Sequence, residues 1–110
     1  MIPRPLKPQY FQILLALASR ELHGYAIQRA VLEQTDDEMR LWPAMLYRSL
    51  TKLEEGGLIR AAEPPEDEPE DERRQYYALT DAGRERLREE AETLARWARQ
   101  AGAADRGVSG

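Results

Sequence analysis

The clearest pattern of hydrophobic and polar positions lies in residues 41–58, where leucines recur at helical spacing. Proline is favoured in the first turn of a helix, where its missing N–H would have no partner, and Pro43 stands there. Gly56 and Gly57 close the stretch, since glycine takes the left-handed conformation without a Cβ clash. The pattern predicts one helix from Pro43 to Glu55. Its apolar stripe consists of Leu46, Leu50 and Leu53.

The opposite face of this helix carries small, hydroxylated or cationic side chains, and no carboxylate precedes Glu54. A helix with such a face can sit in a DNA major groove. An ordinary amphipathic surface helix explains the same pattern equally well. The segments on either side must decide between these interpretations. The residues on this face are Ala44, Tyr47, Arg48, Thr51 and Lys52.

Two more helical patterns precede this helix. Apolar positions at helical spacing cover residues 9–20, and a second helix is predicted from Tyr25 to about Gln34. His23, in the break between them, is placed to cap the second helix. Helix, break, helix, loop and helix is the layout of helix-turn-helix proteins. The residues predicted to face inward are Tyr10, Ile13, Leu14, Leu17 and Ala18, followed by Tyr25, Ile27, Ala30 and Val31.

After these helices the pattern becomes extended. Residues 58–62 are apolar enough for a strand, and residues 73–79 form a second, in which Tyr76 and Tyr77 favour extended structure. Between them, residues 63–72 (EPPEDEPEDE) hold three prolines and seven acids, which predicts a solvated loop. A β-hairpin directly after a helix-turn-helix is a wing. The predicted fold class is therefore mainly α with a small β-hairpin.

The last part of the chain predicts a long helix. Thr80 is a good N-cap and Asp81 suits the positive end of a helix, so we expect a helix from Asp81 to about Ala101. Its apolar stripe is narrow and its other faces are densely charged, which is typical of a coiled-coil-like contact between chains. Residues 1–8 are expected to form an extended basic arm, and residues 102–110 a disordered tail. The stripe holds Leu87, Ala91, Leu94 and Ala98, with Trp97 beside it.

The composition narrows the possible functions. A chain of 110 residues with a net charge of −4 allows one domain, which we assign to residues 9–80, with a modest core. The chain has no cysteine and a single histidine, so we expect neither a disulfide nor a metal site. We find no nucleophile–base pair and no glycine-rich phosphate loop, so we expect no enzyme and no cofactor.

Two further expectations concern location and charge. The chain has no apolar run of membrane-spanning length and no signal segment, so we expect a cytoplasmic protein. The negative net charge argues weakly against nucleic acid as a partner. The local distribution of charge decides binding, however, and the predicted central helix has a cationic face.

Four patches of this sequence resemble the PadR family of bacterial winged helix-turn-helix transcriptional regulators. They lie in the family's order and at its spacing. Residues 13–27 contain ILLALA and LHGYAI, residues 46–59 read LYRSLTKLEEGGLI, residues 73–80 read RRQYYALT, and residues 81–83 read DAG. The single C-terminal helix resembles the short subgroup of the family. The resemblance implies a homodimer on a roughly palindromic DNA operator, usually a repressor, and commonly one that a small molecule releases from DNA.

The resemblance also implies roles for individual residues. In the family, the helix that corresponds to residues 43–55 enters the DNA, and a tyrosine at the position of Tyr47 belongs to its LY pair. Arg73 and Arg74 match paired basic residues on the return strand of the wing. Tyr25 is placed to reach a phosphate. The candidate DNA-binding residues are Tyr25, Pro43, Ala44, Tyr47, Arg48, Thr51, Lys52, Arg73 and Arg74.

Dimerisation in the short subgroup joins the last helix to its two-fold mate and to the partner's first helix. Here Trp97 adjoins that seam, and in such dimers a tryptophan can stack on a flat aromatic effector. Simple interface packing is the alternative role for Trp97. The candidate dimerisation residues are Tyr10, Leu14, Leu87, Ala91, Leu94, Trp97 and Ala98.

The sequence departs from the family's pattern in two places. Trp42, Ala44 and Met45 stand where the family commonly has hydroxyl or other small polar residues, so a helix cap worth about 1 kcal/mol is missing, and we expect Trp42 to compensate by packing. The acidic wing loop is unfavourable near DNA, because like charges repel. It is either a solvated loop that swings clear of DNA, or its acids screen non-specific binding or bind a cation or another protein. The alternative function is therefore a protein-binding module that uses its acidic wing.

Overall fold

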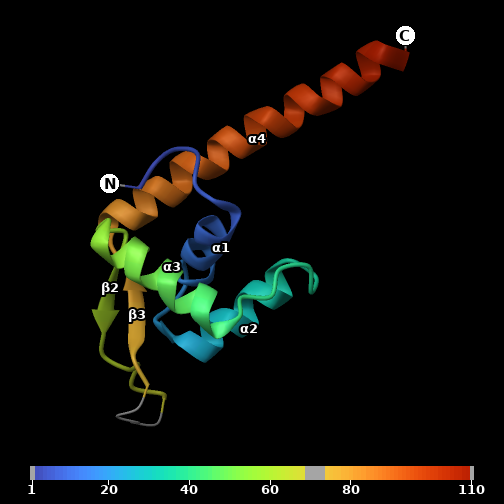
Figure 1. Cartoon of the computed structure of the whole chain (residues 1–110). Coiled ribbons are helices and arrows are strands. Elements are labelled where there is room, and N and C mark those ends of the chain that lie inside the picture. The colour runs from blue at the N-terminus through green and yellow to red at the C-terminus, as the bar shows by residue number, and fades with distance from the viewer. Residues whose placement is uncertain (1, 69–73, 110) are drawn as a thin grey trace.

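The computed structural model describes residues 2–68 and 74–109, and it has the predicted winged-helix layout (Figure 1). Three helices and a small sheet form the body, and a long last helix runs away from it (Figure 1). The elements are α1 (Pro8–Ala16), β1 (Leu22–His23), α2 (Gly24–Gln34), α3 (Pro43–Glu55), β2 (Ile59–Ala62), β3 (Tyr76–Leu79) and α4 (Asp81–Ser109).

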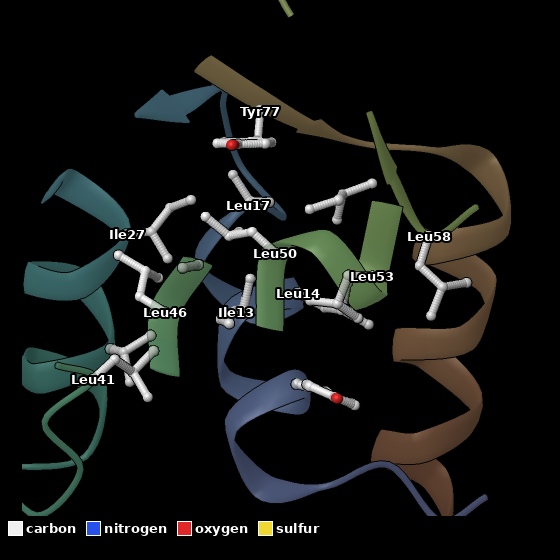
Figure 2. Close-up of a cluster of buried hydrophobic side chains, with 14 of the residues drawn as sticks. Ile13, Leu14, Leu17, Ile27, Leu41, Leu46, Leu50, Leu53, Leu58 and Tyr77 are labelled. Carbon is white, nitrogen blue, oxygen red and sulfur yellow. The ribbon is translucent and has the colours of Figure 1, made fainter. Parts of the chain in front are cut away.

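The core is built around the apolar stripe of α3. Leu46, Leu50 and Leu53 are at most 2% exposed, and they pack with side chains from α1 and α2 (Figure 2). The bounds predicted for α3 are confirmed, including the glycine stop, because Gly57 has a φ of 77°. The surrounding residues labelled in Figure 2 are Ile13, Leu14, Leu17, Ile27, Leu41, Leu58 and Tyr77.

The sheet has three antiparallel strands in the order β1-β3-β2, so the expectation of a two-stranded hairpin was incomplete. Tyr77 in β3 pairs with Leu22 in β1 and with Ala61 in β2. The sequence shows no strand pattern at β1 because it is only two residues long. Its pairing comes from a distant segment of the chain and not from local alternation. β3 also begins at Tyr76, later than the predicted start at residue 73.

Two helix ends differ from the prediction. α1 ends at Ala16 instead of near Arg20, because the following residues lead into β1. α4 continues to Ser109, so the predicted disordered tail is helical over residues 102–109. This segment contains two alanines, which favour a helix, and two glycines, each of which costs about 1 kcal/mol relative to alanine. No helix within residues 2–68 and 74–109 is both long and apolar enough to cross a membrane.

Residues 2–7 of the N-terminal arm are not helical, as predicted, but they bend at Arg4 and Pro5 and pack against α4. Ile2 and Leu6 are buried in the core. The buried guanidinium of Arg86 donates to the carbonyls of Ile2 and Pro3, at 3.0 and 2.9 Å. The N–H of Leu6 donates to the buried carboxylate of Glu90. These contacts fix the first part of α4 on the body of the domain.

The junction between β3 and α4 also packs closely against the body of the domain. The Thr80 hydroxyl accepts the N–H of Gly83 at 2.9 Å, which confirms the predicted cap, and it donates to the carbonyl of Gly57 at 2.7 Å. Gly83 lies directly against the backbone of Leu58, the residue before β2, since a Cβ at position 83 would come within 1.9 Å of the Leu58 carbonyl oxygen. The start of α4 is therefore positioned by backbone contacts.

The first prediction concerns Gly83. Alanine favours a helix over glycine by about 1 kcal/mol, so helix propensity alone says that Gly83→Ala should stabilise the protein. Because the new Cβ would meet backbone that cannot move aside, we expect Gly83→Ala to lower the free energy of unfolding by at least about 2 kcal/mol. Urea denaturation measures this free energy of unfolding. Ala82→Gly, at the exposed neighbouring position, is the control and should cost about 1 kcal/mol. An unchanged or more stable Gly83→Ala protein would contradict the close contact.

Candidate nucleic-acid interface

The outward face of α3 is open to solvent. Pro43, Ala44, Arg48, Thr51 and Lys52 are exposed there. Neither Arg48 nor Lys52 makes an ion pair within the described residues, so both charges are available to an external anion. Because the leucine stripe is buried behind them, these side chains point away from the core. The exposure predicted for this face is thus present, while the contacts with DNA remain predictions.

Tyr47, also on this face, contacts the start of α2. Tyr47 is 52% exposed, and a Cβ on Gly24 would lie 2.7 Å from its hydroxyl oxygen. The Thr51 hydroxyl donates to the Tyr47 carbonyl at 2.9 Å, one turn further along α3. Gly24 therefore makes room for Tyr47 at the place where α2 and α3 meet. The sequence analysis did not single out Gly24, although it belongs to the LHGYAI patch.

Tyr25 lies beside this contact and is 63% exposed, so its predicted inward orientation was wrong. Its ring stacks on His23 at 6.4 Å between centroids, and the Arg29 guanidinium lies 5.9 Å from the ring centre. His23 caps α2 as predicted, because its Nδ1 accepts the N–H of Ala26 at 3.3 Å. The exposed hydroxyl of Tyr25 is therefore free to approach a phosphate, which agrees with the role that the family resemblance implies.

The start of α3 has no side-chain cap, as predicted. Trp42 occupies the N-cap position, but it is exposed and does not anchor the helix in the core. The Arg40 guanidinium lies 5.4 Å from its ring centre. The prediction that Trp42 compensates by packing was therefore wrong. A large aromatic ring with a neighbouring cation instead stands at the end of α3 where the helix dipole is positive.

Tyr77 of β3 belongs to the core cluster behind α3 (Figure 2). Burial, with smaller contributions from the charges of Glu54 and Tyr47, raises the pKa of the Tyr77 hydroxyl above its usual value. Tyr77 therefore stays neutral at physiological pH and acts as a core residue.

Of the two wing arginines predicted to contact DNA, one lies within the described residues. Arg74 lies just before β3, outside the strand, and Arg73 lies outside the described residues. On the other side of the loop, Asp67 and Glu68 pair with Arg20 at 3.0 and 3.6 Å. The sequence analysis predicted a solvated loop here, but Asp67 and Glu68 form ion pairs within the chain. Arg20, which the sequence analysis overlooked, holds them near the segment that follows α1.

The predicted dimerisation residues fall into two groups. Leu14 is wholly buried within its own chain and Tyr10 is almost so, which leaves Leu14 no surface for a partner. Leu87 is partly buried against the core. Beyond it, Leu94 and Trp97 are 41% and 45% exposed on a helix that projects from the body (Figure 1). Ala91 and Ala98 are exposed as well.

The arrangement defines a winged helix-turn-helix protein. The exposed face of its third helix carries uncharged and cationic side chains. The family model described as the transcriptional regulator PadR-like family matches residues 13–89. The chain therefore belongs to the PadR-like family. The description of this family as transcriptional regulators confirms the expected class of protein.

Three similar proteins illustrate the match. An uncharacterized 37.1 kDa protein of transposon TN4556 from Streptomyces fradiae is 44% identical over 84 residues, or 76% of this chain, but the match spans only 22% of that protein. A transcriptional regulator from Clostridium thermocellum has a TM-score of 0.70 at 22% identity, covering 86% of this chain and 87% of the other.

The third is a complex of Bacillus subtilis PadR with operator DNA. It has a TM-score of 0.61 at 25% identity, and covers 76% of this chain and 46% of that one. The chain thus spans less than half the length of this structural neighbour, and about a fifth of the Streptomyces protein.

The second prediction tests the contact between Gly24 and Tyr47. A methyl group at position 24 would displace the flexible end of the Tyr47 side chain, so Gly24→Ala should alter the outward face of α3 and change stability little. We expect DNA affinity to fall at least about fivefold, with a melting temperature close to that of the unchanged protein. Fluorescence anisotropy and thermal melting measure the two effects. Tyr47→Phe, which removes only the hydroxyl, is the control for the loss of a hydrogen bond. Unchanged affinity in Gly24→Ala would rule out this arrangement.

Proposed function

We propose that the protein acts as a homodimer that binds a roughly palindromic operator and represses transcription. The observation that carries the proposal is the open face of α3, where Arg48 and Lys52 have no carboxylate partner among the described residues. An Arg side chain can read guanine bidentately in the major groove, and Lys can neutralise a phosphate. The family to which the chain belongs, and the operator complex of Bacillus subtilis PadR, support DNA as the partner.

The proposed DNA contacts divide by role. Tyr47, Arg48 and Thr51 on the middle of α3 would meet base edges. Lys52, Tyr25 and the two arginines of the wing would meet the phosphate backbone, which fixes the position of the protein on DNA. Pro43 and Ala44 begin α3 and let its first turn approach the groove closely, because their side chains are small.

The exposed seam of α4 supports the homodimer. Leu94, Trp97 and Ala98 lie on a helix that projects from the body, so little of the same chain covers them (Figure 1). Two such helices packed together would bury both seams and hold the two copies of α3 at a fixed spacing. A small aromatic effector that stacks on Trp97 would change this spacing and thereby the DNA affinity.

The second candidate function is a protein-binding module that uses the acidic wing. The ion pairs of Asp67 and Glu68 with Arg20 weigh against it, because these two acids already have a partner within the chain. The two functions respond differently to mutation. Neutralising acids of the wing would abolish a protein contact, whereas it would leave DNA binding intact or strengthen it.

The third prediction tests DNA binding. We expect Arg48→Ala/Lys52→Ala to weaken binding to the duplex upstream of the protein's own gene by more than about thirtyfold, since each lost contact is worth roughly 1–3 kcal/mol. The measurement is fluorescence anisotropy at two salt concentrations, beside a scrambled duplex. The double variant should also show a shallower salt dependence.

The matched control for this experiment is Arg96→Ala/Arg99→Ala, which removes the same charge from exposed positions on α4. This variant should bind about as well as the unchanged protein. Equal losses in both double variants would mean that net charge, and not the face of α3, governs binding.

The fourth prediction tests the dimer. Leu94→Glu places a charge in the apolar seam of α4, so we expect the protein to become monomeric at micromolar concentration. Light scattering after size-exclusion chromatography measures the mass. Ala103→Glu introduces the same charge on the opposite side of the helix, nine residues further along, and should remain dimeric. A dimer that survives Leu94→Glu would place the interface on another surface.

A further inference from the structure

A cavity of about 250 Å³ lies between the segment after α1, the β2–β3 pair and the first turn of α4. Three arginines from these three places line it: Arg20, Arg60 and Arg84. Glu21 is the one acidic residue among the lining side chains. None of these arginines belongs to the outward face of α3, so the proposed DNA contacts leave this cluster unexplained.

The three guanidinium groups have different partners. Arg84 donates to the carbonyl of Ala18 at 3.2 Å, and Arg60 donates to the carbonyl of Ala61 at 3.4 Å. Within the part of the chain that the structure describes, neither makes an ion pair. Two positive charges therefore face the cavity with only neutral partners.

Arg20 differs, because it is already bound by acids of the wing loop. Its guanidinium is 3.0 Å from a carboxylate oxygen of Asp67 and 3.6 Å from one of Glu68. Asp67 and Glu68 do not line the cavity themselves, but they contact Arg20 at its rim. The structure thus shows, at one edge of the cavity, the kind of group that its arginines bind.

We propose that this cavity binds a small anion with at least two negative charges on phosphate or carboxylate oxygens. Guanidinium groups match both oxygen acids in shape and hold them by paired, charge-assisted hydrogen bonds. The volume suits a ligand smaller than most drug-sized molecules. The anion would bind Arg60 and Arg84 and compete with Asp67 and Glu68 for Arg20.

This competition connects the cavity to the wing. When the anion takes Arg20, Asp67 and Glu68 lose their partner and the negative charge beside the wing increases. DNA affinity should then fall, because the freed acids and the anion both repel phosphate. This second step rests on the proposed DNA binding, whereas binding of the anion does not.

The experiment is isothermal titration of the full chain with pyrophosphate and with citrate. Acetate serves as the single-charge comparison, and sodium chloride is matched for ionic strength. We expect one pyrophosphate or citrate per chain, and no saturable binding of acetate. Whether pyrophosphate or citrate binds more tightly identifies the ligand as a phosphate or a carboxylate.

Substitutions separate this site from general charge effects. Arg60→Gln and Arg84→Gln should each weaken binding at least tenfold, while Arg96→Gln, on an exposed part of α4, should leave it unchanged. Asp67→Asn/Glu68→Gln should strengthen binding at least threefold, because it removes the internal competitor. Glu63→Gln/Glu66→Gln removes the same charge from the same loop and should not.

Three outcomes would overturn the proposal. One is equal weakening by Arg96→Gln and Arg60→Gln, and another is a response that sodium chloride reproduces. The third combines two results: the unchanged protein binds neither anion, and Arg60→Gln and Arg84→Gln lose DNA binding. The arginine cluster would then be a contact for the DNA backbone. If Arg84→Gln lowers the melting temperature, Arg60→Gln decides, since the partner of Arg60 is a carbonyl on its own strand.

Discussion

Burial of the leucine stripe of α3 is the interaction on which the rest of the structure depends. Leu46, Leu50 and Leu53 fill the centre of the core, and burial of each such side chain contributes roughly 1.5–3 kcal/mol. A helix of 13 residues is not stable alone in water, so α3 exists because the core holds it. The same packing fixes its rotation about its own axis. Tyr47, Arg48 and Lys52 must then face outward, and any contact that they make with DNA depends on these buried leucines.

A second set of contacts attaches α4 to this core. The buried Arg86 and Glu90 hold the N-terminal arm across the first turns of α4, and Gly83 lets the helix start against the backbone of Leu58. In the proposed dimer, a shift of one α4 would therefore move the attached α3 as a unit. This gives a physical route from the α4 seam to the DNA-facing surface, and it needs no flexible element between them.

Local patterns were enough to predict much of this fold. The stripe of leucines, the first-turn proline and the two glycines predicted both ends of α3, because each signal acts within a few residues of the sequence. The features that were missed depend on contacts between distant segments. The pairing of β1 with β3 joins residue 22 to residue 77, and the arm is held by residues 86 and 90. No periodicity in the sequence reports such contacts.

In the candidate site too, the sequence predicted what local periodicity determines and missed what tertiary contacts determine. Periodicity correctly placed Arg48, Thr51 and Lys52 on an exposed face, since the opposite side of the helix is fixed by the core. It wrongly turned Tyr25 inward, because one aromatic residue at the start of a helix fits either face. It could not show that Gly24 makes room for Tyr47, or that Arg20 holds Asp67 and Glu68. These roles arise from tertiary contacts between residues that the sequence analysis treated separately.

The central claim is that the outward face of α3 meets DNA. It is tested most directly by recording backbone amide NMR spectra of the protein while the upstream duplex is added. The account predicts that the largest shifts fall on Tyr47, Arg48, Thr51 and Lys52, with smaller shifts at Tyr25 and Arg74 and little change over residues 63–66. Large shifts confined to the acidic loop or to residues 94–105 of α4, with the amides of α3 unchanged, would contradict it.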